Sequence, residues 1–217
     1  MPPALRSSAC DGAGPMNPTF KLGLTGSIGM GKSTTAAIFT AFGVPVWDAD
    51  AAVRQLYASG GAAVAPLAAA FPQVIRGGNV SREMIRDQIA RDPAVLPRIE
   101  SIVHPLVAAD RASFLALTRS DLVVLDIPLL FENGTEATLD ATLLATAPPD
   151  LQRARVLARP GMTAAHFATL LARQMPDAEK RKRADHIVET LDLPSTTAYV
   201  KALIAHIRGQ TSSQLRD

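Results

Sequence analysis

The residues in this sequence with the most specific chemistry form a glycine-rich segment that ends in lysine and serine. The segment reads Gly26-Ser27-Ile28-Gly29-Met30-Gly31-Lys32-Ser33 and continues into Thr34. Its spacing is that of the phosphate-binding loop, G-x-x-x-x-G-K-[ST]. Glycines let backbone N–H groups turn toward phosphate oxygens, and a helix that starts there adds its partial positive charge. We predict that these residues bind nucleotide phosphates, with Lys32 on the β- and γ-phosphates and the Ser33 hydroxyl as a ligand for Mg²⁺.

Two common kinds of P-loop protein lack support in the sequence. A GTP switch needs a guanine-reading N-K-x-D string, and none occurs. ATPase motors place a second carboxylate after the acidic residue at a later strand end, whereas Asp126 is followed by Ile127-Pro128. The remaining class is a small kinase, in which a substrate hydroxyl is the acceptor and water must be kept out.

Two carboxylates follow a second short apolar run, Val44-Pro45-Val46-Trp47. They are Asp48 and Asp50, at the carboxyl end of the run, where open parallel sheets bind ligands. Residues two apart on an extended segment face the same side, so both carboxylates could point toward the phosphate. Asp50 is predicted to accept the proton of an attacking hydroxyl or to hold Mg²⁺ through water. Asp48 could share that role or cap a helix beginning at Ala51.

The elements around these residues alternate between strands and helices. Apolar runs of strand length occupy Phe20–Thr25, Val44–Trp47, Leu122–Leu125, Thr142–Ala145 and His186–Val188. Helical patterns lie between them, which favours a parallel sheet with right-handed crossovers. The sequence therefore predicts an α/β fold, a P-loop NTPase-type parallel sheet flanked by helices. A last helix, residues 195–208, should pack Val200, Leu203, Ile204 and Ile207 against the sheet.

Two helical insertions interrupt this core. In residues 51–118 we expect helices and no strands, with Ser81 capping one helix and Asp92 capping another that has Pro93 at its first position. The second of these helices carries an apolar stripe, Leu96, Ile99, Val103 and Leu106. Residues 149–183 are rich in arginine and lysine. There Arg155 and Arg159 stand one helical turn apart and could reach nucleotide phosphates together, the other arginines forming a solvated face.

Composition and net charge indicate which partners and which cellular location to expect. The chain has 22 basic and 20 acidic residues, a net charge of +2 and 5% aromatic residues, so we expect neither a nucleic-acid nor a membrane partner. Its single cysteine suits a cytoplasmic protein. Residues 1–18 have no periodic apolar face and are expected to be a disordered extension, with a small partner-binding tail as the alternative.

Several segments together resemble the dephospho-coenzyme A kinase family. They are the glycine loop, Val46–Asp50, Ile102–Val107 with its His-Pro-Leu, Asp126–Glu132 with its Pro-Leu-Leu-x-Glu, Arg155, Arg159, Arg173-Gln174 and Ala184-Asp185. The resemblance extends from about residue 20 to residue 208. One departure is clear, because Glu189-Thr190-Leu191 stands where the family usually has asparagine and glycine, near the expected adenine contacts.

The resemblance implies a division of the chain and a reaction. Residues 19–50, 119–148 and 184–210 would form the nucleotide-binding core, 51–118 the helical insertion that binds the acceptor, and 149–183 a helical lid. The substrates would be ATP, with Mg²⁺, and dephospho-coenzyme A, in a monomer or small homo-oligomer. A different small-molecule or nucleoside kinase, or a module that binds nucleotide without turnover, are the alternatives.

The resemblance also suggests roles for individual residues. Lys32, Asp50 and Arg159 would be catalytic, and Arg155 would bind ATP. The acceptor would be bound by Asp50, His104, Pro128, Leu129 and Glu132. From spacing alone, His104 could equally be a packed residue and Glu132 a carboxylate at a helix start. In the resemblance, Pro105 kinks its helix and presents the imidazole of His104.

Overall fold

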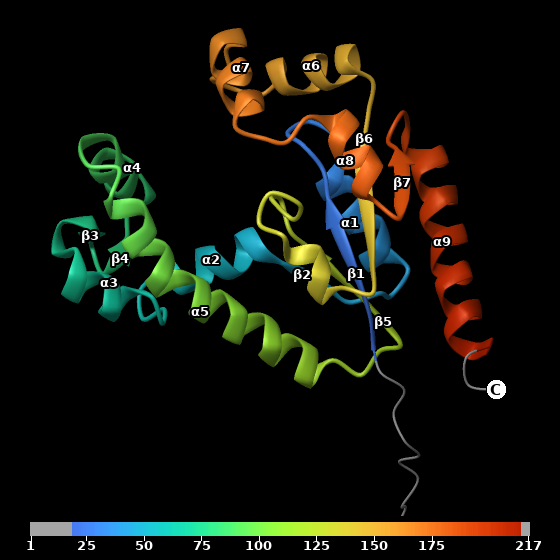
Figure 1. Cartoon of the computed structure of the whole chain (residues 1–217), viewed down its shortest axis with the longest axis horizontal. Coiled ribbons are helices and arrows are strands. Elements are labelled where there is room, and N and C mark those ends of the chain that lie inside the picture. Colours follow the sequence, from blue (N-terminus) through green and yellow to red (C-terminus); the bar gives the residue numbers. More distant parts are fainter. Residues whose placement is uncertain (1–18, 214–217) are drawn as a thin grey trace, which may run out of the picture.

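The computed structural model describes residues 19–213, and its centre is a five-stranded sheet (Figure 1). The strands are β1 (Phe20–Thr25), β2 (Val46–Asp48), β5 (Leu122–Asp126), β6 (Ala141–Thr146) and β7 (His186–Glu189). They lie in the order β2-β5-β1-β6-β7, and every neighbouring pair is parallel. Strands that are buried on both faces are mostly apolar, and β5 is fully buried with four apolar residues before its terminal Asp126. The predicted α/β class is confirmed.

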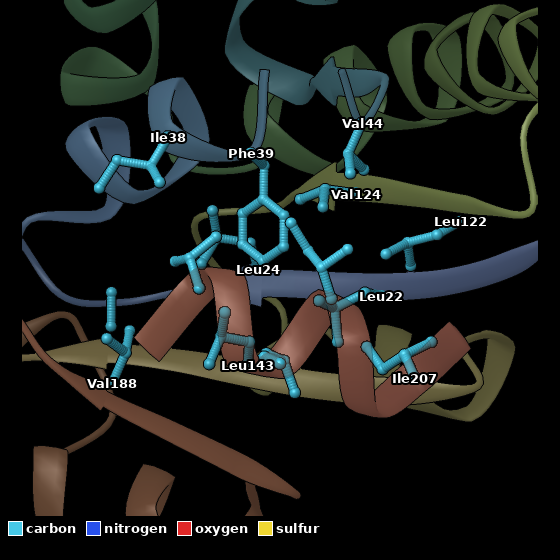
Figure 2. Close-up of a cluster of buried hydrophobic side chains, with 14 residues drawn as sticks. Leu22, Leu24, Ile38, Phe39, Val44, Leu122, Val124, Leu143, Val188 and Ile207 are labelled. Carbon is cyan, nitrogen blue, oxygen red and sulfur yellow. The ribbon is translucent and has the colours of Figure 1, made fainter. Parts of the chain in front are cut away.

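Helices cover both faces of the sheet. On one face α1 (Lys32–Ala41) and α9 (Leu193–Ser213) pack side by side on β1. Figure 2 shows the ring of Phe39, from α1, directed toward Leu24 of β1, and both side chains are fully buried. The predicted apolar face of the last helix is confirmed, because Val200, Leu203, Ile204 and Ile207 are all buried. On the other face Trp47 and Leu125 pack with Phe131 and with the half-buried Phe114.

The insertion between β2 and β5 forms a separate lobe beside the sheet (Figure 1). Its elements are α2 (Ala49–Tyr57), α3 (Val64–Ala70), the 3-10 helix η1 (Pro72–Val74), β3 (Ile75–Arg76), β4 (Asn79–Val80), α4 (Arg82–Arg91) and α5 (Val95–Leu117). The lobe has its own core, which includes Leu67, Phe71 and Ile99. The expectation of no strands was wrong: β3 and β4 form an antiparallel hairpin. Strands of two residues are too short to show a period.

The start of α5 also differs from the prediction. Ser81 caps α4 by accepting a hydrogen bond from Met84 N–H, as expected. Asp92 instead accepts from Ala94 N–H, and α5 begins at Val95, so Pro93 lies before the helix. Val95, one turn before the buried Ile99, takes the buried position, and Leu96 is 40% exposed. Beyond Ile99 the predicted stripe holds, and α5 runs through Pro105 as one continuous helix down to β5 (Figure 1).

The segment after β6 contains three helices, α6 (Pro149–Leu157), α7 (Ala164–Ala172) and α8 (Asp177–Arg183). The first two pack on each other beyond the carboxyl ends of the strands, at the top of Figure 1. The third returns to the core and packs on β6. The predicted extension lies outside the described residues. None of the helices between residues 19 and 213 is long and apolar enough to cross a membrane.

Candidate active site

The glycine loop joins β1 directly to α1. Gly29 and Gly31 have φ angles of 78° and 84°, in the left-handed region that favours glycine. No side chain caps the N-terminus of α1, and its first turn holds no acidic residue. The first backbone N–H groups of this helix are therefore directed at the loop without a capping acceptor, which is the arrangement that binds phosphate.

A cleft of about 530 Å³ opens over this loop. Its lining residues are Gly26, Ser27, Ile28, Gly29, Met30, Gly31, Lys32, Ser33, Thr34, Asp50, Pro128, Arg155, Arg159, Gln174, Thr190, Asp192, Leu193 and Thr196. The structure thus brings all the residues predicted to bind ATP into one cavity. The three residues predicted to be catalytic, Lys32, Asp50 and Arg159, line the same cavity.

Lys32, which lines the cleft, is paired with a carboxylate at the end of a neighbouring strand. Its ammonium donates to Oδ1 of Asp126, the last residue of β5. Burial raises the pKa of Asp126, the Lys32 ammonium acts to lower it, and the nearby carboxylates of Asp48 and Asp50 raise it further. Asp126 thus lies among two other carboxylates and one cation. Its position at a strand end marked it in the sequence, but its contact with Lys32 crosses 94 residues and had no local signal.

The two carboxylates after β2 occupy different positions from those predicted. The backbone does not stay extended, since α2 begins at Ala49 and places Asp50 in its first turn. Asp48 accepts a hydrogen bond from Ala51 N–H and caps this helix, so the alternative structural role applies. Only Asp50 lines the cleft.

The two predicted phosphate-binding arginines have different surroundings. The guanidinium of Arg155 donates to Thr190 Oγ1 at 2.9 Å and to the Thr190 carbonyl. Arg159 lies beyond the end of α6, and its guanidinium has no hydrogen bond or ion pair to another described residue. Arg155 therefore lies at the turn after β7, and Arg159 is free to meet a ligand in the cleft.

Thr190, the departure from the family pattern, packs directly on the glycine loop. Its hydroxyl donates to the Met30 carbonyl at 2.9 Å. A Cβ added at Gly31 would lie 2.5 Å from Thr190 Oγ1, so no larger residue fits there. The sequence of the turn gives no sign of this contact, because 160 residues separate Thr190 from Met30.

A second cavity of about 540 Å³ adjoins the β2–α2 junction. Its lining residues are Trp47, Ala49, His104, Val107, Ala108, Arg111, Ile127, Asn133, Gly134, Thr135 and Thr138, from β2, α2, α5, the loop after β5 and the 3-10 helix η2 (Thr135–Thr138). His104 is exposed on α5 and faces this cavity, not the packed interior. Neighbouring residues line different cavities. Ala49 and Ile127 line the second cavity, and the residues that follow them, Asp50 and Pro128, line the cleft over the glycine loop.

The other residues predicted to bind the acceptor are spread out. Pro128 lines the nucleotide cleft, and Leu129 is 39% exposed outside both cavities. Glu132 lines neither cavity. Its Oε1 accepts from Met175 N–H at 2.9 Å and lies 2.8 Å from Nζ of Lys180, a side chain with no exposed surface. The structure brings Asp50, Pro128 and His104 to the two cavities and leaves Glu132 in an internal ion pair.

Together the fold and the site define a P-loop protein with the sheet order and lid-like helices of a small kinase. The dephospho-CoA kinase family profile matches residues 20–192. A dephospho-CoA kinase from Cereibacter sphaeroides is 67% identical over 189 residues, which cover 87% of this chain and 96% of that protein. One from Ruegeria pomeroyi is 54% identical, with 88% and 96% covered. The chain belongs to the dephospho-CoA kinase family.

A solved structure has the same architecture. The crystal structure of TT1252 from Thermus thermophilus has a TM-score of 0.78 and 36% sequence identity to this chain. The match covers 87% of this chain and 97% of that one. The core, the helical lobe and the segment after β6 are therefore all included in a known architecture.

Proposed function

We propose that this enzyme transfers the γ-phosphoryl group of ATP to the ribose 3′-hydroxyl of dephospho-coenzyme A, giving coenzyme A and ADP, the final step of coenzyme A synthesis. The observation that carries the proposal is a pair of cavities lined by the consecutive residues Ala49 and Asp50, one cavity beside His104 and the other over the phosphate-binding loop, in a chain of this family. A kinase needs two substrates in line across one short gap. The reaction would take place in the cytoplasm, on small-molecule substrates alone.

The glycine loop would hold the phosphates of ATP through its backbone N–H groups. Lys32 would leave Asp126 in part and reach the β- and γ-phosphates, because a phosphate carries more negative charge than one carboxylate. Arg159, whose guanidinium has no partner among the described residues, would neutralise charge on the transferred group. Arg155, held at Thr190, would contact the nucleotide at the opposite end of the cleft.

Mg²⁺ fits the groups that line the cleft. The Ser33 hydroxyl is a hard oxygen ligand beside Lys32. No cluster of three or more His, Cys, Asp or Glu side chains in residues 19–213 is arranged to hold a metal. A divalent ion would therefore depend on phosphate oxygens and water besides Ser33, the coordination that Mg²⁺ commonly has in kinases. When bound, the ion supplies neutralisation of the charge shared by the β- and γ-phosphates.

Asp50 would act on the acceptor. A carboxylate in the first turn of α2, on the boundary between the two cavities, can orient the ribose hydroxyl or accept its proton. His104, Pro128, Leu129 and Glu132 remain predicted acceptor-binding residues. For Glu132 that role would require the carboxylate to leave Lys180 or to use its second oxygen, which has no hydrogen-bond partner among the described residues.

The experiment that tests the function is a comparison of acceptors. ADP release should follow addition of dephospho-coenzyme A to enzyme with Mg·ATP, and should not follow addition of nucleosides or shikimate. Release with a nucleoside alone would indicate a different small-molecule kinase. Nucleotide binding without release on any acceptor would indicate a regulatory module.

A further inference from the structure

One residue of the glycine loop is held by side chains from both ends of the lid segment. Ile28 N–H donates to Gln174 Oε1 at 3.2 Å, and the Ile28 carbonyl accepts from Gln152 Nε2 at 2.8 Å. Gln152 is on α6, and Gln174 follows α7. The lid segment and the loop are thus joined through both polar groups of a single peptide residue.

The two glutamines are not equivalent, because each uses a different half of its amide. A backbone carbonyl can only accept, so Gln152 must direct its NH₂ group at Ile28. A backbone N–H can only donate, so Gln174 must direct its oxygen at Ile28. Gln174 therefore keeps its NH₂ group, with two donors, and Gln152 does not.

Their surroundings differ in the same sense. Gln152 is 5% exposed and lines a separate cavity behind the loop, together with Met30 and Asp177. Gln174 is half-buried and lines both that cavity and the nucleotide cleft. Its Nε2 has no partner among residues 19–213. Of the two glutamines, only Gln174 can therefore present N–H donors to a molecule bound in the cleft.

The backbone beside Gln174 is anchored. The N–H of Met175, the next residue, donates to Glu132, which is paired with the buried Lys180. Glu132 lies in the segment after β5, which also contains the cleft residue Pro128. The turn that holds Arg155 packs instead on Gly31, at the other end of the loop. Gln174 is therefore anchored, through Met175, to the segment after β5, and it lines the same cleft as Asp50.

We propose that Gln174 is a ligand of the transferred phosphoryl group, donating from its amide NH₂ while its oxygen holds the glycine loop at Ile28. The proposal rests on the phosphoryl transfer proposed above. A neutral donor in the cleft would stabilise charge on the phosphoryl oxygens as the bond to ADP breaks. Because Gln174 belongs to the lid segment and also contacts the glycine loop, its contact with the phosphoryl group would depend on the position of the lid.

The test compares methionine at the two glutamines. Methionine has nearly the same length as glutamine and is uncharged. Gln174→Met and Gln152→Met each remove one hydrogen bond to Ile28, but only Gln174→Met also removes the two N–H donors that have no partner. Loss of one transition-state donor lowers kcat by about a hundredfold, so we expect that loss for Gln174→Met and less than about fivefold for Gln152→Met. ADP lacks the γ-phosphoryl group, so its Kd should change by less than about threefold in Gln174→Met.

Gln174→Glu separates the two functions of this side chain. It keeps an oxygen for Ile28 N–H and replaces the NH₂ group, so kcat should fall at least as far as in Gln174→Met while the Tm stays close to that of the wild type. The inference is overturned if Gln174→Glu turns over at near the wild-type rate, or if both methionine variants lose kcat equally. Wild-type enzyme assayed in parallel with dephospho-coenzyme A tests the proposed function separately.

Discussion

Two lysine–carboxylate pairs in this protein join helices to the segment that begins at the end of β5. In the nucleotide cleft Lys32, 16% exposed, contacts Asp126. Away from the cleft Lys180, with no exposed side-chain surface, contacts Glu132. The residue types are almost the same, but the surroundings of the carboxylates differ.

The pKa values of the two carboxyl groups are displaced in opposite directions. For Asp126 burial raises the pKa, and Lys32 does not offset that effect because Asp48 and Asp50 also raise it. For Glu132 burial acts to raise the pKa, but the contacts with Lys180 and Met175 N–H outweigh burial and lower it. The carboxylate of the cleft pair is therefore poorly compensated, whereas the carboxylate of the internal pair is stabilised in its charged form.

The strongest test of this difference is the loss of the cleft lysine. Lys32→Met should reduce transfer by at least about a thousandfold, since it removes a cation expected to supply several kcal/mol of charge stabilisation. The fold should persist, because a carboxyl group whose pKa is already raised can take up a proton. Steady-state kinetics and a thermal melt measure both effects. A residual rate above a tenth of the wild type would remove Lys32 from the mechanism.

Replacing the lysine of the internal pair by methionine should lower stability strongly and activity only weakly. Lys180→Met leaves the Glu132 carboxylate without its cation, and breaking a buried pair in this way costs about 3 kcal/mol or more of stability. Below the melting temperature kcat should fall less than about tenfold, because Lys180 lines no cavity with the nucleotide.

Lys182 provides the matched control on the same helix. It pairs with Glu179 at 2.8 Å but is 70% exposed, so Lys182→Met should change stability by less than about 0.5 kcal/mol. Chemical denaturation of the three proteins measures the difference. Equal stability of Lys180→Met and Lys182→Met would show that the internal pair is not a structural element.

The carboxylate Asp50 links the cleft pair to the acceptor. Asp50→Asn should lower kcat by about a hundredfold and leave ATP affinity nearly unchanged if Asp50 orients or deprotonates the hydroxyl. If Asp50 mainly holds Mg²⁺ through water, the substitution should weaken Mg·ATP binding and be partly rescued by added Mg²⁺. A Mg²⁺ titration of the variant decides between these roles. Near-wild-type kcat at saturating Mg²⁺ would make Asp126 the next carboxylate to examine.

The parts of this site that could be predicted from the sequence are the local ones. The glycine loop, its strand and its helix are adjacent in the chain, so the sequence predicted the structure of residues 26–34, and these residues line the cleft. The sequence predicted Asp50 as a site residue but placed it on extended backbone. It is helical instead, because the strand ends two residues earlier and Asp48 caps the helix that follows.

Long-range pairing could not be predicted. Gln174 is one polar residue after a short helix, and its partner Ile28 lies 146 residues away. The sequence allowed Glu132 to be an acceptor ligand or a carboxylate at a helix start, and it gave no sign of the ion pair with Lys180, which depends on the packing of α8 on β6. Side-chain partners of this kind depend on tertiary contacts that leave no period in the sequence.

The smallest predicted effect concerns the acid side of the stability profile, where the two carboxyl groups should act with opposite sign. Glu132 has a folded pKa below its ordinary 4.5, so the unfolded chain binds the proton more tightly, and the stability contributed by Glu132 is present above that pH and lost as the pH falls through the folded value. Asp126 has a folded pKa above 3.8, so its ionisation costs stability as the pH rises from 3.8 through the folded value. The stability difference between wild type and Glu132→Gln should therefore shrink on acidification. The difference between wild type and Asp126→Asn should change in favour of the wild type over the same titration. Urea denaturation of the three proteins from pH 6 downward measures both slopes, and slopes of the same sign would contradict the contrast between the cleft pair and the internal pair.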